Sequence, residues 1–432
     1  MSLALSSALP GYDEAATLVA AYAARQDRPQ PSLEHVELAS AAGRILARPL
    51  VADQNQPPFC RSTRDGFACR AAEASTHTLL TLAGATHAGE APSGPLPRNA
   101  AWEIMTGAPV PAGADAVMMI EHVERSGDHV RLLPPREIGA GDNIVAQGAQ
   151  ARKGDELLPV GSAIGPAQIA QAAACGCAAL DVFLRPRVAI LTTGDELLPV
   201  ESKPAPGQIR NSNGPMLAAL VAAAGGKPWV LPTAADTEQA LDAALAQAAE
   251  ADMLLVSGGV SAGKFDLVEP ALARFGARFH FTGVRIQPGK PLVFGELPRH
   301  RADPRPSGDA GGEARLQPFF GLPGNPVSSA VTFLLFAAPV LAMLAGSRES
   351  GPRFALAQLA QDTNRHGKPG LTRFLPALCD FNPPAGQLPQ VAAVPWQGSG
   401  DLAAFARSNC FVVAPEEAHL MPAGAIVRIL IL

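Results

Sequence analysis

The stretch RVAILTTGDELLPV, residues 187–200, marks the point where the chain changes from short β-type segments to a regular alternation of strands and helices. Its apolar first half is typical of a buried strand, and a glycine and two acids follow. Helix-type segments then occur at 213–226, 236–252, 267–277 and from Val327, between strand-type segments at 227–233, 253–260, 277–284, 291–297 and 319–324. This alternation predicts a doubly wound, mostly parallel α/β sheet with helices on both faces.

The 432 residues are too many for one ordinary core, so further domains are expected on either side of this unit. Residues 51–144 alternate short apolar runs with turns rich in Gly and Pro, which is typical of β structure. We therefore predict a multidomain α/β plus β protein. Its expected regions are an elongated helical and β linker domain (1–50 with 145–184), a β-rich domain (51–144), the α/β domain (185–350) and a C-terminal β domain (351–432).

Composition narrows the function classes. The net charge is −5, and the 34 basic residues are scattered, so nucleic acid is not expected as a partner. The six cysteines have no zinc-type spacing and are expected to be free thiols of a cytoplasmic protein. The N-terminus lacks the basic region of a signal peptide. The apolar run 327–345 contains Pro339 and several hydroxyl residues, which favours a buried helix over a membrane span.

Polar loops follow three of the predicted strands. They are residues 192–196 (TTGDE), residues 257–261 (SGGVS, followed by Asp266) and residues 321–326 (GLPGNP). In an open α/β sheet, ligands bind beyond the carboxyl ends of the strands. Glycine turns and a helix N-terminus suit a phosphate, and the carboxylates of Asp195, Glu196 and Asp266 could hold Mg²⁺ against it. The loops therefore predict a phosphate or nucleotide site with a metal.

Each loop also has a plainer interpretation. SGGVS could be a tight turn, PGNP a turn that starts a helix, and Asp195 with Glu196 a solvated turn. The expected position of all three loops at one edge of one sheet favours the ligand site. The GxxxxGK[ST] and GxGxxG patterns are absent, which disfavours the common nucleotide-binding folds.

Longer motifs resemble one family. SGGVSAGKFD, QPGKPLVFG and GLPGNPVSSAVTF resemble the molybdopterin-binding domain of molybdenum cofactor biosynthesis proteins. Upstream, STRDGFA (62–68) and IMTGAPVPAGADAVMMIE (104–121) resemble the molybdopterin molybdenumtransferases, a group that includes the C-terminal part of gephyrin. The resemblance extends in order along nearly the whole chain. It implies a small β-barrel-like domain at the C-terminus.

The resemblance also implies an activity. The family inserts molybdenum from molybdate into adenylyl-molybdopterin and releases AMP, with the help of Mg²⁺ or another divalent metal. It implies a homodimer whose site is shared between subunits, with Asp65 and Thr106 reaching the ligand from the partner, and a molybdopterin adenylyltransferase as the upstream donor. The remaining catalytic residues that it implies are Glu196, Asp236, Asp266 and Lys290. The residues expected to bind the cofactor substrate are Gly194, Ser257, Gly258, Gly259, Ser261, Arg285, Pro323, Gly324, Asn325 and Ser328.

The chain departs from the family pattern on the side that would bind the oxyanion. Gln287 stands where lysine is common, Gln150 replaces an acid, and Leu371 replaces an arginine, with Arg285 and Arg373 as possible substitutes. Asn211 and Ser212 replace the commoner acid and threonine. Three alternatives therefore stay open. They are a molybdopterin-binding or scaffolding protein with weak turnover, tungstate-specific insertion, and the adenylyltransferase step.

The heptapeptide GDELLPV occurs at 154–160 and again at 194–200. The flanking residues differ at once, so the two copies are not an internal repeat. We expect Asp155 and Glu156 to be solvated turn residues, and Glu196 to lie at the ligand edge of the sheet.

Overall fold

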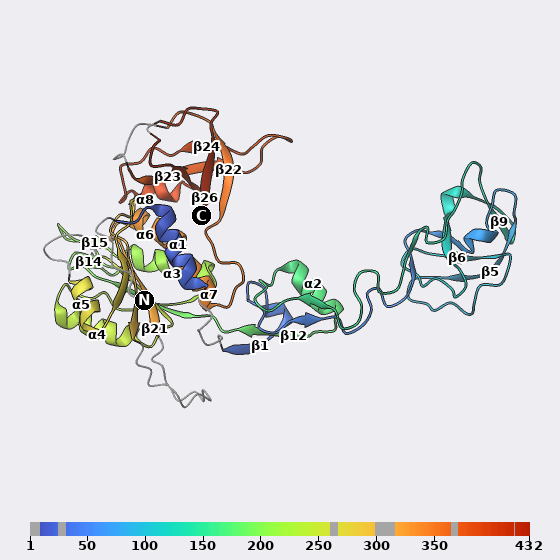
Figure 1. The fold of residues 1–432 in the computed structure, drawn as a ribbon, viewed down its shortest axis with the longest axis horizontal. Helices are drawn as coiled ribbons and strands as arrows, with labels where there is room; N and C mark the ends of the chain where they lie inside the picture. The colour runs from blue at the N-terminus through green and yellow to red at the C-terminus, as the bar shows by residue number, and fades with distance from the viewer. Residues whose placement is uncertain (1–8, 25–31, 260–266, 299–315, 364–369, 419) are drawn as a thin grey trace.

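The computed structural model describes residues 9–24, 32–259, 267–298, 316–363, 370–418 and 420–432. The molecule is elongated (Figure 1). The α/β domain and the C-terminal domain lie together at one end, a small module with α2 (Pro166–Ala174) follows, and a β-rich domain forms the other end.

The α/β domain is built on a six-stranded sheet of order β16-β13-β17-β21-β20-β18. The first four strands are parallel, and β20 runs antiparallel to both of its neighbours, β21 and β18. In chain order the strands are β13 (Arg187–Thr192), β16 (Lys227–Val230), β17 (Met253–Ser257), β18 (Arg278–Thr282), β20 (Val293–Pro298) and β21 (Leu316–Leu322). The predicted mostly parallel sheet is confirmed.

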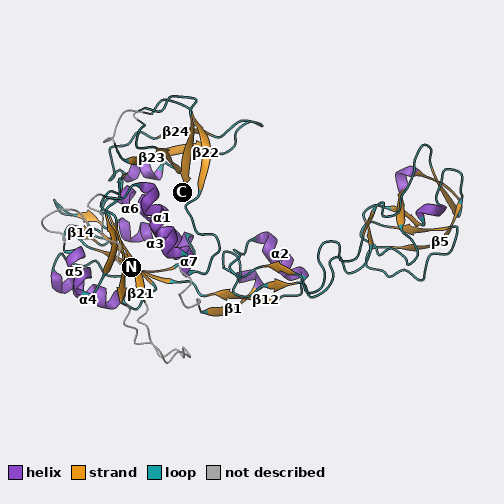
Figure 2. Cartoon of the chain, in the orientation of Figure 1, coloured by secondary structure: helices purple, strands orange, loops and turns teal. Residues whose placement is uncertain are grey.

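Alternate residues of the buried strands enter different cores, because side chains of a strand point to opposite faces. Ile190 and Leu255 join the core formed with α3 (Asn213–Ala223). Leu191 and Val256 join the core formed with α4 (Glu238–Ala248) and α5 (Val268–Arg274). Helices therefore cover both faces of the sheet, as the alternation predicted (Figure 2).

The apolar run after PGNP forms one continuous helical rod. It consists of α6 (Pro326–Thr332), a π-helical turn (Phe333–Ala337) and α7 (Ala338–Leu344). Among the described residues this is the one helix with the length and apolarity of a membrane span, but 72% of its most apolar window is buried inside the protein. The predicted buried helix is confirmed, and the π turn precedes Pro339.

Helix α1 (Tyr12–Ala23) corrects one expected boundary. The sequence placed residues 1–50 with the linker region, yet α1 packs against α7 and shares the core of the α/β domain. Tyr12 lies edge-on to Phe336 and Phe374, and Tyr22 lies edge-on to Phe294. These apolar contacts come from residues distant in sequence, so the local pattern of the N-terminal segment could not reveal them.

The small module joins two separate stretches of chain. Strand β1 (Leu33–Glu37) pairs antiparallel with β12 (Ala179–Phe183), and β2 (Leu50–Val51) pairs with β11 (Glu156–Leu158). A 3₁₀ turn, Leu38–Ser40, packs beside α2. Cys175 is buried in this module, and all six cysteines of the chain are free thiols.

The β-rich domain holds a six-stranded sheet of order β7-β4-β6-β5-β9-β8. Its strands are β4 (Gly66–Cys69), β5 (Leu80–Thr86), β6 (Ala100–Ile104), β7 (Ala116–Met119), β8 (Val123–Ser126) and β9 (His129–Leu132). Strands β3 (Arg61–Ser62) and β10 (Ile144–Val145) pair at its junction with the module. Two 3₁₀ turns, Ala71–Glu73 and Ile120–His122, complete it.

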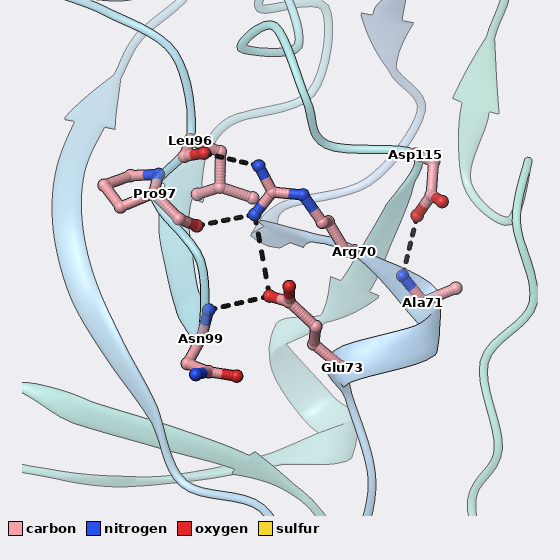
Figure 3. Close-up of polar contacts among 7 residues, drawn as sticks. All are labelled: Arg70, Ala71, Glu73, Leu96, Pro97, Asn99 and Asp115. Atoms are coloured by element: carbon pink, nitrogen blue, oxygen red, sulfur yellow. Dashed lines mark hydrogen bonds and ion pairs between the residues drawn. The ribbon is translucent and has the colours of Figure 1, made fainter.

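A polar cluster fastens the turn after β4 to the loop before β6 (Figure 3). The Arg70 guanidinium donates to the carbonyl oxygens of Leu96 and Pro97, both at 2.6 Å. The Glu73 carboxylate accepts from the Asn99 backbone N–H at 2.7 Å and lies 3.5 Å from the Arg70 guanidinium. Because each charged group has fixed partners, this cluster holds the antiparallel pair β4–β6 in place at one end.

The C-terminal domain closes into a small barrel. Strands β23 (Thr372–Asp380), β24 (Gln390–Ala393), β22 (Phe354–Leu359), β26 (Ile426–Ile431) and β25 (Cys410–Ala414) are neighbours in that order, and β25 pairs back to β23. Helix α8 (Leu402–Ala406) precedes β25. Strand β19 (Ile286–Gln287), which leaves the α/β domain, adds to β23. The expected barrel-like domain is confirmed.

Candidate functional site

Three parallel strands end side by side at one edge of the α/β sheet. In register, Thr192 of β13 is opposite Ser257 of β17, and Ser257 is opposite Leu322 of β21. The loops that follow these residues therefore emerge next to one another. The structure brings together the described parts of the three polar loops that the sequence singled out, residues 192–196, 257–259 and 321–326.

The TTGDE loop is joined by hydrogen bonds to Asp236, which lies before α4. Thr193 Oγ1 donates to Asp236 Oδ1 at 2.5 Å, and the Asp236 backbone N–H donates to Asp195 Oδ1 at 3.0 Å. The Glu196 carboxylate folds over Gly194, where an added Cβ would lie 2.7 Å from it. Gly194 has a φ of 147°, which also favours glycine. Asp195, Glu196 and Asp236 are all exposed, so their oxygens are open to a ligand.

These carboxylates fit a divalent metal in part. Within the described part of the chain, no group of three acidic, His or Cys side chains could hold a metal by itself. Mg²⁺ commonly takes only one or two protein carboxylates and completes its shell with water and substrate phosphates. The exposed oxygens of Asp195 and Glu196 suit such an incomplete set. Ser261 and Asp266, the other expected members of this site, lie outside the described residues.

The second loop depends on glycine. Gly258 has a φ of 97°, and a Cβ on it would lie 2.5 Å from the Thr193 carbonyl oxygen. Gly259 has a φ of 61°, and a Cβ on it would lie 2.6 Å from Val268. Only glycine lets this loop pass so close to the TTGDE loop and α5. The two expected binding residues thus have a structural requirement that is independent of any ligand.

The third loop packs against the second. The position of a Cβ on Gly324 lies 3.6 Å from Gly258 Cα. The Ser329 hydroxyl donates to the Pro323 carbonyl and lies 3.4 Å from the Ser257 hydroxyl. Ser328 is buried at the start of α6. The expected binding residues Ser257, Pro323 and Gly324 therefore belong to one packed unit at the sheet edge, in which Ser257 and Pro323 are buried and Gly324 is exposed.

Two further residues complete this edge, and sequence reasoning missed both. Asn213 joins the second and third loops through its carboxamide. Ser399, from the C-terminal domain, accepts from Asn325 Nδ2 at 2.9 Å, and its carbonyl accepts from the Val327 N–H at 3.0 Å. The only signal for Asn213 was its place in RNSNG, and Ser399 lies in a QGSG turn without a distinctive pattern.

The cationic residues that the sequence predicted for the site, Lys290 and Arg285, lie in two separate places. Lys290 is exposed on the turn that enters β20. The Arg285 guanidinium lies 3.8 Å from Glu416 and beside Gly11, in a groove between α1 and the C-terminal domain. Gln287 pairs in register with Arg373, which is buried and donates to the Ala418 carbonyl. Arg373, not Arg285, is therefore the cation opposite Gln287.

Asp65, just before β4, and Thr106, just after β6, meet each other in the β-rich domain. This domain lies at the opposite end of the molecule from the α/β domain (Figure 1). Asp65 Oδ1 accepts from the Thr106 backbone N–H at 2.6 Å and from its Oγ1 at 2.7 Å. The backbone bond and then the hydroxyl bond lower the pKa of Asp65 from its usual value. Both residues are exposed, and the same chain does not bring them to the sheet edge.

Comparison with known proteins covers the chain in three consecutive parts. The MoeA N-terminal region (domain I and II) matches residues 11–176, the probable molybdopterin binding domain matches 189–343, and the MoeA C-terminal region (domain IV) matches 358–432. The order of these regions follows the order of the folded domains.

Proteins that match this chain over nearly its whole length support the same assignment as the three regional matches. The molybdopterin molybdenumtransferase of Nostoc sp. is 32% identical over 93% of this chain and 89% of its own length. That of Haemophilus influenzae is 32% identical over 92% of this chain and 93% of its own length. The crystal structure of a molybdopterin biosynthesis moeA protein from Pyrococcus horikoshii is 27% identical, with a TM-score of 0.76 over 98% of this chain and 100% of that one. The chain therefore belongs to the molybdopterin molybdenumtransferase family, a family of transferases in molybdenum cofactor biosynthesis.

Proposed function

We propose that the protein inserts molybdenum from molybdate into adenylyl-molybdopterin and releases AMP, with Mg²⁺ or another divalent metal. The observation that carries this proposal is the convergence of the 192–196, 257–259 and 322–325 loops beside exposed carboxylates. The named relatives, which match over nine tenths of the chain, support the same reaction.

The residues have separate tasks in this proposal. Glycines 258, 259 and 324 let the phosphates of the substrate approach the backbone closely. Asp195 and Glu196 hold the metal, and Asp236 is held in place by Thr193. When bound, Mg²⁺ neutralises charge on the phosphate groups. Lys290 offers an exposed positive charge to the anionic substrates.

We further propose that the working unit is a homodimer with a shared site. Asp65 and Thr106 lie in the domain at the opposite end of the elongated chain from the sheet edge (Figure 1). The sheet edge of one chain therefore lacks this pair, and a second copy of the chain could supply it. The two hydrogen bonds from Thr106 favour the charged form of Asp65 and lower its pKa, so the pair would present a fixed carboxylate to the site.

The reaction can be tested in a single turnover. Purified protein, adenylyl-molybdopterin, molybdate and Mg²⁺ should yield one AMP per site together with active cofactor. Tight binding without AMP release would instead favour the scaffolding alternative. Activity with tungstate but not molybdate would favour tungsten insertion, and formation of adenylyl-molybdopterin from ATP would favour the adenylyltransferase step.

The shared site has its own test by complementation. Asp65→Asn and Glu196→Gln each remove one side of the site, so each homodimer should be inactive. Random exchange of subunits makes half of the dimers mixed, each with one intact site, which predicts a return of about a quarter of the wild-type activity. If the mixture stays inactive while co-purification of differently tagged subunits shows that mixed dimers form, the shared site is wrong.

We also propose that the protein acts in the cytoplasm, downstream of a molybdopterin adenylyltransferase. Its free thiols suit a reducing compartment. The proposed substrate already carries an AMP group, so an enzyme of the adenylyl-transfer class must supply it.

A further inference from the structure

Asn213 connects two loops at the sheet edge through its side-chain carboxamide. It is the first residue of α3, and its Nδ2 donates to Ser257 Oγ at 2.8 Å and to the Gly324 carbonyl at 2.7 Å. Ser257 ends β17, and Gly324 follows β21. One carboxamide therefore fixes the separation between the two glycine loops.

The oxygen atom of this carboxamide, Oδ1, has an unusual environment. Asn213 is 9% exposed, and its Oδ1 is buried without a hydrogen-bond partner. A buried acceptor left unpaired costs free energy in the folded protein. An asparagine with a purely structural role would be expected to satisfy both of its ends.

Asn211 shows what such a structural asparagine looks like. It is also 9% exposed, but both polar atoms of its side chain have partners. Its Nδ2 donates to Thr192 Oγ1 at 2.8 Å, and its Oδ1 accepts from the Gly214 N–H at 2.9 Å. The two asparagines are two positions apart and differ in what they leave unsatisfied.

We propose that Asn213 is a positioning residue. It holds the 257–259 and 323–325 loops in register for the phosphate-bearing part of the substrate, and its Oδ1 gains a donor only in the substrate complex. This inference rests on the proposed function, because it takes adenylyl-molybdopterin as the ligand of these loops. The contact of the two loops, with 3.6 Å between Gly258 Cα and a Cβ position on Gly324, leaves little freedom to compensate for a lost bridge.

The test compares substitutions at the two asparagines in the full-length protein. Binding of adenylyl-molybdopterin without molybdate gives the dissociation constant, thermal unfolding gives stability, and addition of molybdate gives turnover. Asn213→Ala removes the bridge together with the unpaired oxygen, so the dissociation constant should rise about tenfold while Tm stays within about 2 °C of the wild type. Asn213→Asp keeps the size but loses the donor, and it should weaken binding as much.

Asn211→Ala is the matched control. It breaks the hydrogen bonds to Thr192, Thr233 and Gly214 without removing any unpaired atom, so Tm should fall by more than about 3 °C while the dissociation constant stays within about twofold. Wild-type affinity in Asn213→Ala or Asn213→Asp would overturn the inference, as would losses of Tm equal to those of Asn211→Ala. A wild-type protein that binds without turnover would contradict the proposed function but leave the Asn213 comparison intact.

Discussion

Thr193 and Asp236 are 43 residues apart in the sequence, yet Thr193 Oγ1 donates to Asp236 Oδ1 at 2.5 Å. The bond joins the loop after β13 to the segment before α4, and an isolated bridge between Thr193 and Ala234 runs alongside it. Asp236 in turn donates its backbone N–H to Asp195. Thr193, Asp195 and Asp236 are thus joined by hydrogen bonds, and together with Glu196 they form the acidic corner of the sheet edge.

Gly194→Ala should disrupt this corner. The added Cβ would lie 2.7 Å from the Glu196 carboxylate, and alanine is strained at a φ of 147°. We expect a fall in metal insertion of about tenfold or more, because the carboxylate must move away. Single-turnover AMP release measures the effect.

Gly207→Ala is the control for backbone strain alone. Gly207 also has a positive φ, of 87°, but no atom lies within 4 Å of its Cβ position. Stability should fall by about 1 kcal/mol while AMP release stays near the wild-type rate. Equal losses of activity in the two variants would show that strain, not displacement of Glu196, is responsible.

Thr106→Val should raise the pKa of Asp65. The hydroxyl bond is lost while the backbone bond can remain, so part of the lowering should persist. In the wild type this depressed pKa contributes stability above the unfolded-state pKa of the carboxyl, and the contribution is lost as pH falls through the folded-state value. Carboxyl NMR titration measures the shift. Asp401, whose lowered pKa depends on backbone bonds from Ala404 and Gln397, should not change.

Arg70→Ala should destabilise the β-rich domain. The guanidinium is partly buried and donates to two carbonyl oxygens besides its contact with Glu73 (Figure 3). A loss of about 1–3 kcal/mol is expected, measured by denaturant unfolding. Arg125→Ala removes a half-exposed ion pair with Glu103 and should change stability by less than about 1 kcal/mol. Similar losses would mean that the Arg70 cluster has no special role.

The sequence predicted the α/β domain well because its strands and helices have strong local patterns. The apolar VAIL and MLLV runs and the glycine turns after them identified both the sheet and its ligand edge. The grouping of α1 was wrong because Tyr12 and Tyr22 pack on aromatic residues far away in the chain. Local periodicity contains no information about such contacts.

The polar partners of the site were harder to predict for the same reason. Asn213 and Ser399 act through hydrogen bonds to loops that lie 44 and 74 residues away. Arg285 is only two positions from Gln287, but its guanidinium lies beside Glu416. Of the two arginines that the sequence offered as substitutes, Arg373 is the one that the pairing of β19 with β23 sets opposite Gln287.

The doubled heptapeptide offers the most direct test of the central claim, that the edge formed by β13, β17 and β21 is the reaction site. Glu156 begins the short strand β11 of the small module, and Glu196 lies over Gly194 at the sheet edge; both are exposed. Glu196→Gln and Glu156→Gln make the same chemical change within the same seven residues. Single-turnover AMP release with molybdate and Mg²⁺ should fall by about a hundredfold in Glu196→Gln and stay near the wild-type rate in Glu156→Gln. Equal rates in the two variants would contradict this placement of the site.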